Sequence, residues 1–294
     1  MSAPQVVVVG DLVTDVVAQL GQPLAVGSDA QARIRSRGGG SAGNVAAWLA
    51  EAGATVALVA RIGADETGRR LAQELADRGV ELHLAVDDDL PTGTVVVIVT
   101  PDGERTMLSD RGANLRLSPA DIPPKLLAES LHLHLSGYTL LDDGPRAAGL
   151  EALRLVSSHG ATTSVDPSSV QPLMALGPHR FLELTAGVGL CVPNLAEAQL
   201  LTGARDPDEA ARRLADAFAE VVVTLAVDGA VWSGGGRSVR GPAVPAEAID
   251  TTGAGDAFTA GYLAARLAGA PVEERLLRGA ELAARAVQIL GGRP

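Results

Sequence analysis

Short apolar runs alternate with amphipathic stretches along most of the chain, and this pattern predicts strands that alternate with helices. The first run, VVVV at 6–9, is β-branched and ends at Gly10, as expected of a buried strand in a parallel sheet. The same pattern predicts further strands at 55–63, 80–86, 131–137, 161–167, 188–194 and 221–227. It predicts helices at 43–54, 66–79, 146–160 and 208–220, and from about 254 and 272. We therefore expect an α/β fold with a doubly wound, mostly parallel sheet flanked by helices.

Two segments interrupt this rhythm, at about 11–37 and 91–112. The second contains two strand-like runs joined by the turn sequence Pro101-Asp102-Gly103. These segments are expected to form a small β flap, or lid, over one end of the sheet. The sequence has no internal repeat and no linker-like stretch, so we expect residues 1–294 to form a single domain with the lid as an appendage.

Composition narrows the choice of partners. The formal net charge of −11 argues against a general affinity for nucleic acid or anionic membranes, which both require a surplus of Lys and Arg. Cys191 is the only cysteine, and the N-terminus lacks the pattern of a signal peptide. Apolar runs are too short to span a membrane. We expect a cytoplasmic protein whose partners are small molecules.

Lysine is almost absent. Lys125 is the only one in the chain, and no G-x-x-x-x-G-K-[ST] string occurs, so a P-loop is excluded. A phosphate site in this protein must therefore rely on other groups, such as main-chain N–H donors.

The stretch DTTGAGDAFTAGYLAA at 250–265 offers such donors. Its glycines allow close approach of a ligand to the backbone, and the helix that begins near Ala254 directs unpaired amides to the same place. Asp256 in the first turn could serve only as a favourable N-terminal charge. Alternatively, it could act on a ligand held by the amides.

This stretch resembles the C-terminal signature of the ribokinase, or pfkB-type, family of carbohydrate kinases, D-T-x-G-A-G-D-x-F followed by a helix of small residues. The resemblance implies a ribokinase-like fold. It assigns Gly253, Ala254 and Gly255 to an anion hole for the phosphoryl group in flight. It also assigns Asp256 as the general base that removes the proton from the accepting hydroxyl.

The glycine-rich stretch at 38–44 fits three patterns. Gly38-x-Gly40-x-x-Gly43 fits a dinucleotide-binding loop, and Gly39-x-Ser41-x-Gly43 fits a hydrolase nucleophile elbow. Both require an apolar strand upstream, whereas the preceding residues, QARIRSR, are polar and basic. The stretch also resembles the N-terminal signature of the same kinase family, which implies that Gly40, Ser41 and Asn44 line the sugar pocket. A helix-capping role for Asn44 is the structural alternative.

Three further segments match the family in the expected order. In GDLVTD, the resemblance implies that Asp15 accepts hydrogen bonds from substrate hydroxyls, with Asp11 a weaker candidate; a solvated turn is the alternative for either. In VPNLAEAQLLTG, Asn194 and Glu197 have the spacing of a capping pair. The resemblance instead assigns them to the nucleotide site, where Glu197 organises the water shell of Mg²⁺.

In VVVTLAVDGA, the resemblance assigns Thr224 and Gly229 to the nucleotide site, although Ala226 stands where the family usually has glycine. Members of the family often bind a monovalent cation such as K⁺ beside the anion hole. Here it would be held by carbonyls near Asp250 and Thr252 and from the last helix.

The resemblance implies ATP-dependent phosphorylation of a hydroxyl, expected to be primary, on a sugar or sugar derivative, with ATP and Mg²⁺ as cofactors. A non-catalytic sugar sensor of the same fold and, less favoured, an NAD(P)-dependent oxidoreductase are the alternatives. Ser41 stands where ribokinases commonly have lysine, which disfavours ribose. No Phe, Trp or Tyr lies within 11–44 or 91–112, which disfavours a nucleoside acceptor.

The basic residues of the lid segments leave the acceptor open. They could hold a phosphosugar or a sugar acid, or form a solvated strand; they are Arg33, Arg35, Arg37, Arg105 and Arg111. An exposed lid strand is better covered than left open, and family members often pair such segments. We therefore expect a homodimer formed through the lid.

Overall fold

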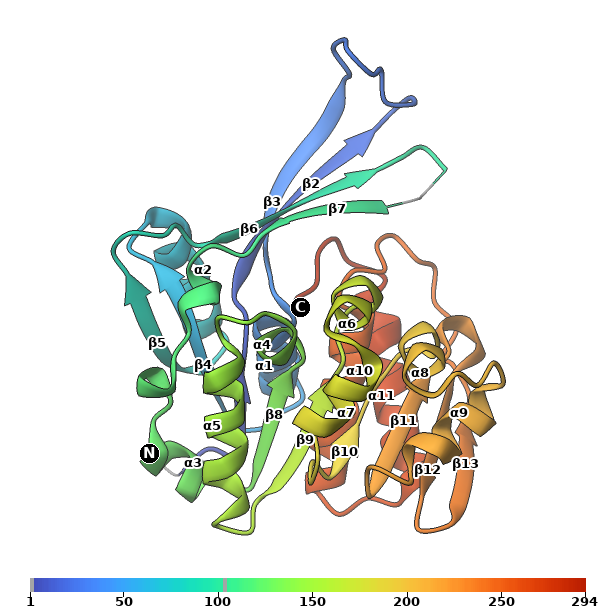
Figure 1. Cartoon of the computed structure of the whole chain (residues 1–294). Helices are drawn as coiled ribbons and strands as arrows, with labels where there is room; N and C mark the ends of the chain where they lie inside the picture. Colours follow the sequence, from blue (N-terminus) through green and yellow to red (C-terminus); the bar gives the residue numbers. More distant parts are fainter. Residues whose placement is uncertain (1–2, 103–104) are drawn as a thin grey trace.

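The computed structural model describes residues 3–102 and 105–294, and its body is a nine-stranded sheet between two layers of helices (Figure 1). The strand order is β13-β12-β11-β10-β9-β8-β1-β4-β5. Neighbouring strands from β5 to β11 run parallel, and β12 and β13 are added antiparallel at one edge. The strands are β1 Val6–Val9, β4 Val56–Gly63, β5 Glu81–Asp87, β8 His132–Ser136, β9 Thr162–Asp166, β10 Leu190–Cys191, β11 Glu220–Thr224, β12 Ala230–Gly234 and β13 Arg237–Gly241. The predicted doubly wound α/β fold is confirmed.

The position of β1 determines where a ligand can bind. The chain moves from β1 to β4 and β5 on one side, and later returns to β8 on the other side of β1. The strand order therefore reverses between β1 and β8, and the crevice outside the carboxyl ends of such strands is the usual ligand site of open α/β sheets. Asp11 and Ser136 lie at these two carboxyl ends.

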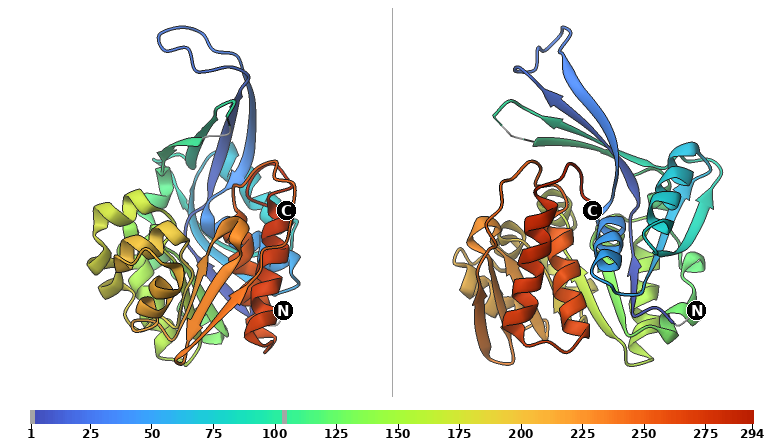
Figure 2. Two further views of the ribbon diagram at one scale, coloured as in Figure 1. Left: turned by 90° about the vertical axis from the view of Figure 1, so that its right-hand side faces the viewer. Right: turned by 180° about the vertical axis from the view of Figure 1, so that it is seen from behind.

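Helices cover both faces of the sheet because its strands are apolar on both sides. Along β1, Val7 and Val9 belong to one buried cluster, and Val6 and Val8 belong to the other. The second cluster packs against α1 Ser41–Glu51, α2 Glu66–Ala76, α10 Ala254–Leu267 and α11 Val272–Ala286, which lie toward the viewer in the right-hand view of Figure 2. The first cluster packs against α3 Pro124–Glu129, α4 Tyr138–Leu141, α5 Arg146–Ser157, α6 Val170–Leu176, α7 Pro178–Leu184, α8 Leu195–Thr202 and α9 Pro207–Leu214.

A second sheet projects from the body above the carboxyl ends of the strands (Figures 1 and 2). We call it the lid sheet; its order is β3-β2-β6-β7, with β2 Val13–Leu20, β3 Ala32–Gly39, β6 Gly93–Val99 and β7 Arg105–Asp110. The two segments that interrupted the helix and strand rhythm supply these four strands. The turn expected between β6 and β7 includes Gly103, which lies outside the described residues.

Most predicted elements are present, and the differences have local causes. The helix expected at 208–220 ends at Leu214, and a turn precedes β11. The hairpin of β12 and β13 was not predicted, although Gly235 and Gly236, both with positive φ, form its turn. In the described part of the chain, no helix is both long enough and apolar enough to cross a membrane.

Candidate functional site

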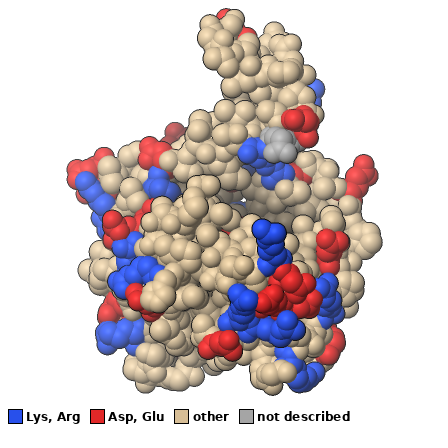
Figure 3. Space-filling model, turned by 45° about the vertical axis from the view of Figure 1, so that its right-hand side comes forward, with Lys and Arg blue, Asp and Glu red and all other residues tan. Residues whose placement is uncertain are grey.

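A cavity of about 400 Å³ lies between the lid sheet and the carboxyl ends of the strands. The molecular surface is hollowed where the lid sheet meets the body (Figure 3). The underside of the lid sheet contributes Val13, Asp15, Val95, Val97, Arg105, Met107 and Ser109, which share one face by the strand register. The body contributes Asp11, Gly40, Ser41, Asn44, Arg111, Tyr138, Asp166, Ser168, Val192, Asn194, Glu197, Thr224, Thr251, Thr252, Gly253, Gly255 and Asp256.

The start of α10 presents unpaired amides to this cavity. Gly253 is the N-cap residue, and its φ of 74° is a left-handed conformation that favours glycine. In residues 3–102 and 105–294, no acceptor approaches the N–H groups of Gly253, Gly255 and Asp256. Ala254 differs from the prediction in detail, because its N–H donates a long bond of 3.4 Å to the Thr251 carbonyl and it does not line the cavity. These amides fit an anionic group.

The Asp256 carboxylate lies beside these amides and is held from α1. Its Oδ1 accepts a hydrogen bond from Ser41 Oγ at 2.9 Å, and its Oδ2 accepts one from Asn44 Nδ2 at 2.8 Å. Burial raises the pKa of Asp256 to about 8, and the neighbouring Asp166 adds to this rise, while the bonds from Asn44 and Ser41 oppose it. A carboxylate with such a pKa can accept a proton near neutral pH.

Asn44 lies within α1 and does not cap it. The N-cap residue is Gly40, whose φ of 92° and close approach to the Asp11 carbonyl require glycine. The capping alternative for Asn44 is therefore wrong, and the amide is free to contact Asp256 and the cavity. Ser41 is the first residue of the helix, so its hydroxyl also points across to α10.

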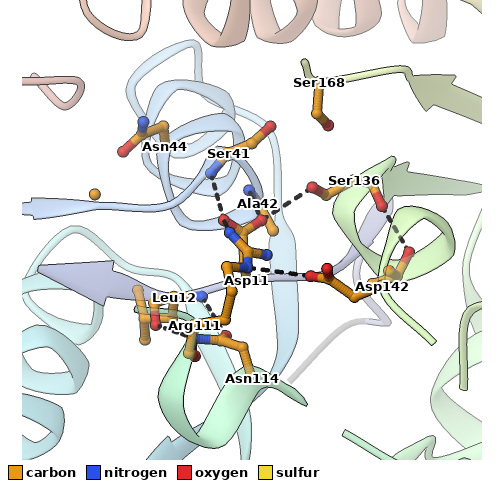
Figure 4. Close-up of polar contacts among 12 residues, drawn as sticks. Asp11, Leu12, Ser41, Ala42, Asn44, Arg111, Asn114, Ser136, Asp142 and Ser168 are labelled. Carbon is orange, nitrogen blue, oxygen red and sulfur yellow. Dashed lines mark hydrogen bonds and ion pairs between the residues drawn. The ribbon is translucent and has the colours of Figure 1, made fainter. Parts of the chain in front are cut away.

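Asp11 is tied to the protein on every side (Figure 4). Its carboxylate accepts hydrogen bonds from Ser136 Oγ at 2.9 Å and from the Ser41 N–H at 3.2 Å, and a longer one from the Ala42 N–H. Arg111 lies 3.4 Å from it and 3.3 Å from Asp142. Asp11 therefore fixes the first turn of α1 at the junction of β1 and β8.

Asp15 has a different environment. It is buried at the base of β2, and no donor in the described part of the chain hydrogen-bonds to its carboxylate. Burial raises its pKa to about 6, although Arg293 opposes the rise. A buried carboxylate that faces a cavity without a protein donor can accept hydrogen bonds from ligand hydroxyls.

Asn194 and Glu197 form both bonds of a capping box at the start of α8. Glu197 Oε2 accepts from the Asn194 N–H at 3.0 Å, and Asn194 Oδ1 accepts from the Glu197 N–H at 3.0 Å. In addition, Glu197 Oε1 accepts from Asn194 Nδ2 at 2.7 Å. The structural and functional interpretations are therefore compatible, because both residues also line the cavity.

Asp166 is the last residue of β9 and forms an acidic pair with Glu197. Burial, together with Glu197, raises the pKa of Asp166 well above its usual value, and burial raises that of Glu197 to about 7. Two carboxylates that oppose each other's ionisation fit a divalent cation, which would neutralise both. Among the described residues, no cluster of three or more His, Cys, Asp or Glu side chains that could hold a metal ion occurs.

The remaining candidates divide between the cavity and its surroundings. Thr224 lines the cavity, whereas Gly229 does not. Gly229 has a φ of 87° and lies close to the Gly241 carbonyl, so it serves the turn into β12. Ala226 adopts the left-handed conformation, with φ of 52°, that glycine would adopt freely. The loop therefore keeps a left-handed path at Ala226, at a conformational cost.

The residues proposed for a monovalent cation form a tight turn. Asp250 Oδ1 accepts from the N–H and Oγ1 of Thr252, at 2.9 and 2.7 Å. Its Oδ2 accepts from the Gly291 N–H at 3.0 Å, beyond the last helix. Arg105 of the lid sheet lies 3.2 Å from the same carboxylate. The role of the nearby carbonyls stays a prediction.

Only some of the arginines of the lid segments line the cavity. Arg105 and Arg111 line the cavity, but both are paired with carboxylates. The arginines of β3 do not line it; they are Arg33, Arg35 and Arg37.

Several residues of this region were not identified from the sequence, among them Tyr138, Asp166, Ser168 and Arg293. Tyr138, whose ring lies 4.1 Å beneath the Arg111 guanidinium, is an aromatic side chain in the cavity, so the aromatic argument against a nucleoside is incomplete. Asp166 ends β9 and Ser168 follows it, and their position at a strand's carboxyl end was a usable signal. Ser168 has a left-handed φ of 73°. The buried Arg293, which contacts Asn44, gave no signal.

The two alternative motifs at 38–43 lack their structural context. The strand before Gly40 is β3, which is antiparallel to β2 in the lid sheet and does not belong to the parallel sheet. A dinucleotide fingerprint or a nucleophile elbow needs a parallel strand there, so both interpretations are wrong.

Comparison with known proteins agrees with this geometry. The chain matches the pfkB family carbohydrate kinase over residues 3–294. It is 32% identical to the ribokinase of Mus musculus over 98% of this chain and 90% of the relative. It is also 32% identical to the 2-dehydro-3-deoxygluconokinase of Thermoproteus tenax, over 78% of this chain and 73% of the relative.

Among solved structures, the adenosine kinase from Sinorhizobium meliloti is similar with a TM-score of 0.90 and 29% identity, covering 100% of this chain and 96% of that one. The Arabidopsis thaliana ribokinase complexed with ribose and ATP is similar with a TM-score of 0.84 and 25% identity, covering 99% and 94%. The fold is therefore ribokinase-like. The chain belongs to the pfkB family of carbohydrate kinases, enzymes of ATP-dependent phosphorylation.

Proposed function

We propose that this kinase transfers the γ-phosphoryl group of ATP to a primary hydroxyl of a sugar or sugar derivative, with Asp256 as the general base. One observation carries the proposal: the Asp256 carboxylate, with a raised pKa, lies at the unpaired amides of α10 in a cavity that also contains Asp15. A proton acceptor, anion donors and a hydroxyl acceptor therefore share one space.

The chain's own residues divide the work. Asp15 accepts hydrogen bonds from acceptor hydroxyls, and Asn44 and Ser41 hold the Asp256 carboxylate so that it takes the proton of the attacking hydroxyl. The N–H groups of Gly253, Gly255 and Asp256 stabilise the negative charge of the transferring group. Glu197, Asp166 and Asn194 would hold hydrated Mg²⁺, which supplies charge neutralisation on the nucleotide phosphates. Thr224 lies on the nucleotide side, and a monovalent cation beside Asp250 and Thr252 stays part of the proposal.

The experiment is an ADP-release screen of the purified chain with Mg²⁺ against hexoses, pentoses, nucleosides, sugar acids and sugar phosphates, with and without K⁺. The proposal expects turnover with at least one acceptor, and nuclear magnetic resonance of the product should show the phosphate on a primary carbon. Asp256→Asn is the matched control, because it keeps the size of the side chain. Tight sugar binding without ATP turnover would instead favour a non-catalytic sensor.

We further propose that the lid sheet joins two copies of the chain in the cytoplasm. The outer face of this sheet is apolar and includes Ile34, 66% exposed, and Leu108, 55% exposed, on its two edge strands. A second copy would cover this face and the edges. Light scattering should show a dimer at micromolar concentration, and Leu108→Lys should shift it to monomer; a wild-type chain that is only monomeric would contradict the proposal.

A further inference from the structure

The segment that follows α11 is inserted between the two parts of the proposed catalytic site. A Cβ on Gly253 of the anion hole would lie 2.5 Å from Gly292 Cα, so the two glycines touch. On the other side, Trp48 Nε1 of α1 donates a hydrogen bond to the Gly292 carbonyl at 2.9 Å. The next residue, Arg293, turns inward and is only 8% exposed.

The Arg293 guanidinium occupies a space that the glycine-rich stretch leaves open. Its Nη2 donates to the Gly39 carbonyl, and its Nε donates to Asn44 Oδ1 at 3.1 Å. A Cβ on Gly38 or on Gly43 would collide with the guanidinium. These are two of the three glycines that suggested a dinucleotide loop, so packing against Arg293 gives them a different role.

We infer that Arg293 is a positioning residue for the phosphoryl transfer, which acts through the Asn44 amide on Asp256. An asparagine amide can be turned either way, with oxygen or nitrogen toward a given neighbour. Arginine offers only donors, so Asn44 must turn its oxygen toward Arg293. Its Nδ2 then faces Asp256 and donates to Oδ2 at 2.8 Å.

The inference rests on the proposed function of Asp256, and it is specific to the Asn44 link. The charged and titratable groups that bear on Asp256 are Asp11 after β1, Asp166 at the end of β9, Glu197 on α8 and Tyr138 on α4. Those that bear on Arg293 are Glu74, Asp15, Arg78 and Asp11. Arg293 donates to Asn44, and Asn44 donates to Asp256, so the amide is the contact that links the guanidinium to the carboxylate.

The test compares Arg293→Met with Arg293→Gln, which can still donate to Asn44, and with Trp48→Phe, which loosens the same segment without contacting Asn44. Arg293→Met should lower kcat at pH 7 by about tenfold, the cost of one hydrogen bond to a charged group, with the KM for ATP unchanged. It should move the acid limb of the rate profile to higher pH by about one unit. Arg293→Gln should recover most of this loss, and Trp48→Phe should lower Tm without moving the limb.

Two outcomes overturn the inference: an Arg293→Met profile that superimposes on the wild type after a fall in Tm only, or equal losses in Arg293→Met and Arg293→Gln. Should Arg293→Met fail to fold, Arg293→Gln and Gly43→Ala, which displaces Nη2, serve in its place. The Asp256 pKa, followed by ¹³C nuclear magnetic resonance without substrate, must rise in the impaired variant. Failure of the proposed function would appear separately, as absence of ATP turnover in the wild type.

Discussion

The hydroxyl of Ser41 donates a hydrogen bond of 2.9 Å to the Asp256 carboxylate, although 215 residues separate the two in sequence. The bond joins the first turns of α1 and α10, the helices that carry the two glycine-rich signatures. A charge-assisted bond of this kind favours the ionised form of the carboxylate, which is the form that a general base requires.

The pH dependence of the kinase activity should therefore reflect the ionisation of Asp256. Burial raises the Asp256 pKa from 3.8 to about 8, so kcat/KM for the acceptor should rise with pH and level off above about 8. The Ser41 hydroxyl donates a bond that lowers the Asp256 pKa. In Ser41→Ala the acid limb of the pH–rate profile should therefore move to higher pH by about half to one unit. The measurement is kcat/KM from pH 5.5 to 9.5 for both proteins. An acid limb near pH 4 in the wild type, or an acid limb that does not move in Ser41→Ala, would contradict the assignment of Asp256 as the general base.

Asp256 should also reduce stability at alkaline pH. Its folded-state pKa lies above the unfolded value of 3.8, so the native state binds the extra proton between about pH 4 and 8 and loses that stabilisation as pH rises through this window. Asp256→Asn cannot ionise, so its Tm relative to the wild type should increase from pH 5 to pH 9. Calorimetry at several pH values checks this. A difference in Tm that stays constant with pH would show that the carboxylate is not buried as described.

Asp15 and Asp11 should behave differently although both line the cavity. Asp15 has no protein donor in the described chain, so Asp15→Asn should fold normally and raise the KM for the acceptor by about tenfold or more. Asp11→Asn leaves the amides of α1 and Arg111 poorly paired, so it should lower the free energy of unfolding by about 1–3 kcal/mol. Steady-state kinetics and urea unfolding of both variants separate the roles; the reverse pattern would refute them.

Ala226 offers a test of the loop before β12. A left-handed conformation costs a residue with a Cβ about 1–2 kcal/mol. Glycine avoids this cost, but it loses more conformational entropy on folding than alanine, which offsets part of the gain. Ala226→Gly should therefore stabilise the fold by about 0.5–1 kcal/mol. The control is Ala76→Gly at the exposed end of α2, which should destabilise by up to about 1 kcal/mol. Equal destabilisation in both would mean that the loop is not strained at Ala226.

The sequence was most informative where a feature is local. The continuous β-branched run at 6–9 is visible in four letters and predicted a buried strand; the structure packs alternate valines of this strand into two clusters, one on each face of the sheet. Gly40 and Gly253 adopt positive φ angles, and a glycine-rich stretch of sequence is a usable sign of such backbone conformations. Resemblance to a family then supplied roles for Asp256, Asn44 and Asp15, which the structure brings into one cavity.

The features that escaped prediction depend on distant parts of the chain. Nothing near Tyr138 indicates that α4 delivers it to the cavity beneath Arg111, because that meeting depends on the order of the strands. Arg293 is similar: an arginine is normally expected at the surface, and the space beside Gly38 and Gly43 allows this one to be buried. The Asn44 capping alternative failed because the helix begins four residues earlier than that role requires.

The most direct test of the central claim is kcat of Asp256→Asn beside the wild type, with the acceptor found in the screen and saturating ATP and Mg²⁺. Circular dichroism and Tm first establish that the variant is folded. General-base catalysis predicts that kcat falls by about 10²–10⁴-fold while binding of the acceptor persists. A folded Asp256→Asn protein that retains near-native kcat would contradict the account.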